Sequence, residues 1–174
     1  VSSSTIYYNT FFIQFQLGTA DKDMFIGVSP PPDSYPDGTT WGIADFVAPW
    51  FSAMSYGATY IRLADSNQGS AGQYHSIAIG YSSTSTPTYE AAATNVAVAV
   101  DDVIVIWYDG RTLGYYLIKS NGTITTLKES ITYTIPPTHG VQFDSVFGGL
   151  NGEIKYLYIN DTCPYATSIA NLKA

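Results

Sequence analysis

One continuous apolar run constrains the fold of this chain more than any other feature. Residues Val103–Tyr108 read Val-Ile-Val-Ile-Trp-Tyr, so both faces of a strand built from them are apolar. The turn residues Asp109 and Gly110 follow, and a second β-branched and aromatic run, Leu113–Lys119, leads back. Asp-Gly between two such runs is typical of an antiparallel hairpin. We therefore predict two adjacent antiparallel strands, the first of them a central strand covered on both faces, with Trp107 in the core.

Short apolar runs and turn residues recur along the rest of the chain. Near the N-terminus, Phe11, Ile13 and Phe15 alternate with a second set of residues that includes two glutamines, which is the period-two pattern of a strand. A proline-rich loop covers residues 29–38, and Asn-Gly at residue 121 marks another turn. We predict an all-β protein, an antiparallel β-sandwich formed by a single domain over residues 1–174. The tail from residue 164 is expected to form a short helix or a docked extension.

The stretch from Asp101 to Asp161 resembles a known family. Its motifs are the apolar strand with Trp107, the Asp-Gly turn, the tyrosine-rich second strand, and Phe-Gly-Gly…Asn-Gly-Glu-Ile-x-x-Leu-x-Ile over residues 147–159. This order is similar to the C-terminal half of LamG-like, concanavalin A-like domains of lectins and glucanases. The resemblance implies a jelly-roll sandwich, with sugar or protein binding as common uses. A fold by itself does not determine function.

The composition excludes several classes of protein. Charged residues make up 12 % of the chain and aromatic residues 15 %, which is far from the charge-rich, aromatic-poor composition of disordered chains. The net charge is -7 with seven Lys and Arg residues, too few cations to neutralise a row of phosphates, so we expect no nucleic-acid partner. No apolar run reaches the length of a membrane-spanning segment.

Several features favour an extracellular or cell-surface location. The chain begins at Val1 rather than Met, so we expect either a processed protein or a domain excised from a longer one. Lysines are few, serines and threonines are abundant, and Cys163 has no second cysteine to pair with. Two Asn-x-Thr sequons, at Asn121 and Asn160, are glycosylation candidates. Such triplets also arise by chance, so modification of either asparagine is left open.

The carboxylates do not form the pattern of a glycosidase. Glycoside hydrolysis needs two carboxylates that face each other across a cleft. The three glutamates, Glu90, Glu129 and Glu153, are scattered and lack the Glu-x-Asp-x-Glu pattern of glucanases. Asp45 lies between apolar neighbours, where a carboxylate is costly, and we expect it to pair with Arg62 rather than to act in catalysis. We predict that the protein is not an enzyme, with glycoside hydrolase as the enzymatic alternative.

Metal ligands are sparse in the sequence. His75 and His139 are isolated and lack partners at ligand spacing. The family resemblance implies an oxygen-rich calcium site at the rim of the sandwich, because concanavalin A-like domains often carry one. The candidate calcium ligands are Asp101, Asp102, Asp109 and Asp144. The alternative is a plain polar edge, and no other cofactor is expected.

Aromatic residues near predicted loops suggest a sugar-binding surface. Pyranose rings stack on the faces of tryptophan and tyrosine rings. The glycan-binding candidates are Trp41, Trp50, Tyr56 and Tyr60. Buried core aromatics give the same pattern in sequence, so the core alternative stays open.

The N-terminal strand suggests self-assembly. Residues 1–17 form an apolar strand at a chain end, and Phe11, Ile13 and Phe15 would fill a groove of a neighbouring subunit if residues 5–17 were exchanged or donated. The alternative is pairing within its own sheet. We predict a structural, adhesive protein that assembles with itself as a surface or filament (pilus-like) subunit. A carbohydrate-binding, lectin-like module of a larger secreted or cell-surface protein is the alternative.

Overall fold

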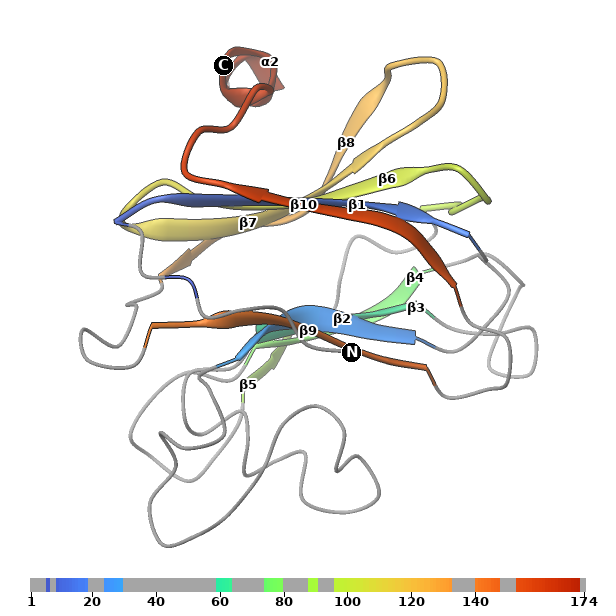
Figure 1. Ribbon diagram of the computed structural model, residues 1–174, viewed down its shortest axis with the longest axis horizontal. Helices are drawn as coiled ribbons and strands as arrows, with labels where there is room; N and C mark the ends of the chain where they lie inside the picture. Colours follow the sequence, from blue (N-terminus) through green and yellow to red (C-terminus); the bar gives the residue numbers. More distant parts are fainter. Residues whose placement is uncertain are drawn as a thin grey trace, which may run out of the picture.

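The computed structural model describes residues 6, 9–18, 24–29, 59–63, 74–79, 88–90, 96–132, 140–147 and 153–172. Within these residues, two antiparallel sheets of five strands stack face to face (Figure 1). The first sheet has the order β10 (Ile154–Asn160), β1 (Phe11–Leu17), β6 (Val103–Tyr108), β7 (Thr112–Ile118) and β8 (Ile124–Thr132). The second has the order β5 (Thr88–Glu90), β4 (Tyr74–Ile79), β3 (Thr59–Leu63), β2 (Met24–Ser29) and β9 (Gln142–Phe147). The predicted antiparallel β-sandwich is confirmed.

The β6–β7 hairpin forms where the Asp-Gly turn predicted it. Asp109 Oδ1 accepts hydrogen bonds from the backbone nitrogens of Arg111, at 2.9 Å, and Thr112, at 2.7 Å. Gly110 takes a φ of 96°, a left-handed conformation that glycine adopts without steric cost. The two strands then pair in continuous register from Val103 opposite Ile118. Local turn chemistry therefore fixes this hairpin.

Strand β1 lies in the middle of its sheet and not at an open edge. It is hydrogen-bonded to β10 on one side and to β6 on the other. Phe11, Ile13 and Phe15 are fully buried between the sheets, and the Phe15 ring lies 5.4 Å from that of Phe143 on β9. Pairing within its own sheet is therefore the correct interpretation of residues 11–17. The three self-assembly candidates form the chain's own core, because both edges of their strand are already occupied.

The outer face of the first sheet is partly covered by the C-terminal segment. Helix α2 (Ala166–Leu172) lies above this sheet in Figure 1, and its Ile169 is buried. A second apolar cluster packs α2 against the sheet; its buried members are Phe12, Val105, Tyr116, Ile118, Cys163 and Ile169. Strand β6 is thus covered on both faces, as predicted, although Trp107 is only half-buried at the border of this cluster. In the part of the chain that the structure describes, no helix is long and apolar enough to span a membrane.

Candidate functional site

The part of the first sheet that α2 leaves open carries two exposed tyrosines on β10. The side chains of Tyr156 and Tyr158 are 39 % and 47 % exposed. In the strand register, Tyr156 lies opposite Gln16 and Tyr158 opposite Gln14. Residues paired in this way share one face of a sheet, so all four side chains lie on the outer face. We call this surface, together with Asn160, the β10 platform.

Side-chain amides hold both tyrosine rings of the platform in place. Gln14 Nε2 donates to Tyr156 Oη at 2.5 Å, and Asn160 Nδ2 donates to Tyr158 Oη at 2.5 Å. Each phenol accepts its bond from an amide and so retains its own O–H as a donor. Fixed rings lose little conformational freedom when a ligand binds, which favours affinity. The platform therefore offers two oriented aromatic faces with polar groups at their rims.

Aromatic contacts on the same outer face of the sheet support the platform. The Phe12 ring lies 6.1 Å from the Tyr158 ring, at an interplanar angle of 64°. On its other side, Phe12 lies 6.0 Å from the ring of Tyr165, which precedes α2. Burial raises the pKa of the Tyr165 phenol, and the nearby Tyr156 phenol and Cys163 thiol raise it further. The C-terminal segment that contains Tyr165 therefore lies along one side of the platform.

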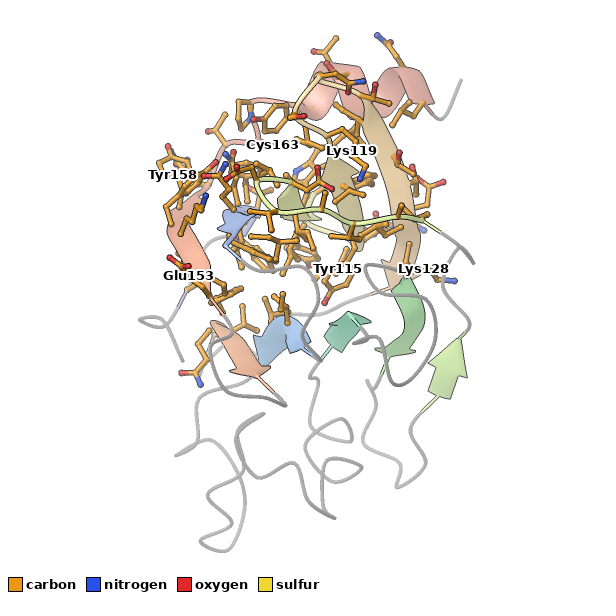
Figure 2. The ribbon with its side chains drawn as sticks, turned by 90° about the vertical axis from the view of Figure 1, so that its right-hand side faces the viewer. Tyr115, Lys119, Lys128, Glu153, Tyr158 and Cys163 are labelled. Carbon is orange, nitrogen blue, oxygen red and sulfur yellow. The ribbon has the colours of Figure 1, made fainter. Side chains whose placement is uncertain are left out.

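The charged groups at one end of the platform are already paired. Lys155 Nζ lies 2.5 Å from Asp101 Oδ1. This hydrogen bond raises the pKa of the Lys155 ammonium, and the charges of Asp101 and Glu153 raise it further. Asp101 has a φ of 71°, and its backbone nitrogen donates to the Leu17 carbonyl at 2.9 Å. Figure 2 shows Glu153 near one end of β10 and Tyr158 nearer the other.

The three predicted calcium ligands whose side chains the structure describes are each engaged within the protein. Asp102 is buried and accepts from Lys119 Nζ at 2.6 Å, whereas Asp101 pairs with Lys155. Asp109 is used by the β6–β7 turn, and Asp144 lies on β9 opposite Gly27, with its side chain outside the described residues. Among the residues the structure describes, no three His, Cys, Asp or Glu side chains are placed to share a metal ion. The described aspartates form structural pairs and a turn instead.

The predicted glycan-binding residues fall largely outside the described part of the chain. Trp41, Trp50 and Tyr56 lie there, as does Asp45. Tyr60 is placed by its backbone only, on β3 between Gly27 and Ala78. Tyr156 and Tyr158 were not among the residues predicted to bind glycans; their signal in the sequence is a Tyr-x-Tyr pair in the last strand, beside a lysine and an asparagine.

The two sequons differ in their surroundings. Asn121 is exposed in the turn between β7 and β8, where its Oδ1 accepts from the Thr123 backbone nitrogen at 3.0 Å. Asn160 is half-buried, and both ends of its amide are engaged. Its Nδ2 donates to Tyr158, and its Oδ1 accepts from the Asp161 nitrogen at 2.7 Å.

Comparisons with known proteins address the fold. No protein-family model matches this chain, and no curated protein does. Among solved structures, it is similar to a functionally unknown protein from Saccharomyces cerevisiae, with a TM-score of 0.52 and 10 % identity over 94 % of this chain and 73 % of that one. It is also similar to peanut lectin with a nine-residue peptide, with a TM-score of 0.47 and 16 % identity over 88 % and 73 % of the two chains. For alginate lyase A1-II' the TM-score is 0.43, with 10 % identity over 92 % and 66 %. The likeness to the yeast protein, at 10 % identity, extends to fold alone, an antiparallel β-sandwich.

Proposed function

We propose that this protein is a non-enzymatic carbohydrate-binding protein of the cell surface or extracellular space, and that the β10 platform is its binding surface. The observation that carries the proposal is the pair of exposed tyrosines, Tyr156 and Tyr158, each held by an amide. The apolar C–H faces of sugar rings pack on aromatic rings, while sugar hydroxyls exchange hydrogen bonds with phenols and amides. An exposed aromatic face with polar rims supplies both kinds of contact.

The geometry of β10 favours an extended oligosaccharide over a single sugar. Residues two apart on one strand face are separated by about 7 Å along the strand. The rings of Tyr156 and Tyr158 therefore lie in line along the edge of the sheet, with Gln14 and Gln16 beside them. A chain of sugars lying along β10 would contact both rings at once.

The platform itself lacks the acid pair that glycoside hydrolysis requires. Its five side chains are two phenols and three amides, none of which is a carboxylic acid. At one end of the platform, the Asp101 carboxylate is bonded to Lys155. Hydrolysis needs one acid to protonate the leaving oxygen and a second to act as base or nucleophile. Binding without cleavage is therefore what this surface supports.

Binding measurements on an oligosaccharide panel test the proposal. We expect the wild-type chain to bind at least one oligosaccharide by calorimetry, and Tyr158→Ala or Tyr156→Ala to weaken that binding about tenfold or more, equivalent to about 1.4 kcal/mol. Leu172→Ala is the matched control, because Leu172 is 49 % exposed on α2. Absence of binding across the panel, or equal loss in the control, would refute a site on β10.

Self-assembly as a filament subunit is a second candidate, through a different surface from the one predicted. Among the strands that the structure describes, β10 is the last of its sheet, and Leu157 is 37 % exposed there. An open strand edge can pair with a second copy of the chain. Lys155 and the register shift between Gln16 and Leu17 oppose such pairing, because charges and bulges protect strand edges. Electron microscopy of the concentrated protein would show filaments if this second proposal holds.

A further inference from the structure

We propose that the β10 platform selects neutral glycans and rejects chains of uronic acids, an inference that rests on glycan binding as proposed above. Its basis is the charge balance of the two strands that form the platform. The sequences of β1 and β10 contain one cationic residue, Lys155. A uronate chain carries a carboxylate on each sugar, and such groups are bound by lysine or by the bidentate fork of arginine.

The charge of Lys155 is already balanced by the protein. Its Nζ lies 2.5 Å from Asp101 Oδ1, and Glu153 also acts on it electrostatically. One ammonium thus faces two carboxylates of its own chain. A ligand carboxylate would have to compete with both, and the side chain of Asp101 is 52 % exposed to repel it.

The other described cations lie outside the two strands that form the platform. Lys119 follows β7 and is bonded to Asp102 and to the Ala97 carbonyl. Lys128 is on β8, which lies at the opposite edge of the sheet from β10, and Arg111 is in the β6–β7 turn beside Asp109. No second cation among the described side chains therefore comes from the strands that bear the tyrosines.

A further charge next to the platform is negative. Asp161 follows directly after β10 and is exposed, and the chain as a whole carries a net charge of -7. Fields of one sign slow the approach of ligands of the same sign and weaken their binding. The amides of Gln14, Gln16 and Asn160 can exchange hydrogen bonds with sugar hydroxyls, but they carry no positive charge to balance a carboxylate.

A matched pair of ligands tests this selectivity. The probes are a β-1,4-glucan hexamer and the same hexamer with its C6 positions oxidised to carboxylates, which share one backbone and differ in charge. We expect the neutral hexamer to bind at least tenfold more tightly at low ionic strength. The gap should narrow as salt is raised, because the screening length falls from about 10 Å at 0.1 M to about 3 Å at 1 M.

Two variants tie the selectivity to named residues. Asp101→Asn releases the charge of Lys155 and keeps a side chain that tolerates a positive φ. We expect it to tighten binding of the oxidised hexamer several-fold and to leave the neutral hexamer unchanged. Glu153→Gln should act in the same direction and provides a second test if Asp101→Asn is poorly folded.

Tighter binding of the oxidised hexamer to the wild-type chain would overturn neutral selectivity while leaving glycan binding intact. Binding of neither hexamer, nor of any other sugar, would overturn both proposals.

Discussion

Lys119 and Asp102 form an ion pair that joins the end of β7 to the start of β6. Lys119 Nζ lies 2.6 Å from Asp102 Oδ2, and the Asp102 side chain is 3 % exposed. The same oxygen accepts the Ala99 backbone nitrogen at 2.8 Å. We expect Asp102→Ala to lower the free energy of unfolding by roughly 2–4 kcal/mol, because it removes these bonds and leaves the partly buried lysine uncompensated. Urea denaturation measures this change.

The lysine side of the pair provides the control. Lys119→Met keeps the packing of the aliphatic stem but leaves the Asp102 carboxylate buried, so it should also be strongly destabilising. The double variant should be less destabilised than the sum of the two single changes, as expected for side chains in contact. Additive effects, or a loss below about 1 kcal/mol for Asp102→Ala, would mean that the pair does not stabilise the fold.

A buried tyrosine makes stability sensitive to alkaline pH. Burial raises the pKa of the Tyr116 phenol, and the charges of Glu129, Asp109 and Cys163 raise it further. Tyrosine in an unfolded chain titrates near pH 10, so the unfolded state loses its proton first. The stability from this group is complete below about pH 10 and falls as pH rises toward the folded pKa. We expect the urea midpoint to drop above about pH 10, and Tyr116→Phe to reduce that drop. An unchanged alkaline drop in Tyr116→Phe would assign it to other groups.

The C-terminal cover of the sheet can be followed through Cys163. Its thiol is buried beneath α2, and burial raises its pKa, so both access and thiolate content are low. We expect slow reaction with a thiol reagent in the native protein. Ile169→Ala removes a fully buried side chain of α2, which should cost about 2–5 kcal/mol locally and speed the labelling markedly. Leu172→Ala, at an exposed position of the same helix, should leave the rate unchanged. Equal labelling rates in all three proteins would show that α2 does not protect the thiol.

Sequence patterns predicted the strands where local signals agreed. The apolar run and the turn at Asp109 and Gly110 both pointed to the β6–β7 hairpin, since its pairing is decided within a few residues. The sequence contains no comparable local signal for the pairing of β1 with its partner strand β10. Gln14 and Tyr156 meet although 142 positions separate them, and a pairing of that range is set by the whole fold. This is why an N-terminal strand suited to donation proved to be a central strand.

The candidate site was hidden from sequence for a related reason. A Tyr-Leu-Tyr sequence fits a buried strand as well as an exposed one, and only the edge position of β10 leaves Tyr156 and Tyr158 open. For the aspartates, adjacency in the sequence was the misleading signal. Asp101 and Asp102 looked like adjacent metal ligands, but their lysine partners lie 54 and 17 positions away. Charge pairing over such distances is invisible to motif spacing.

The two sequons should behave differently when the chain is expressed in a glycosylating host. Asn121 is exposed in the β7–β8 turn, so we expect a glycan there, removed by Asn121→Gln and detected as a mass shift. Asn160 uses its Nδ2, the atom that a glycan would occupy, to hold Tyr158 at 2.5 Å, and we expect it to stay unmodified in folded protein. A glycan on Asn121 would emerge beside β8, at the opposite edge of the sheet from the platform, and should not reduce oligosaccharide binding. A glycan found on Asn160 would contradict this prediction and would cover the β10 platform.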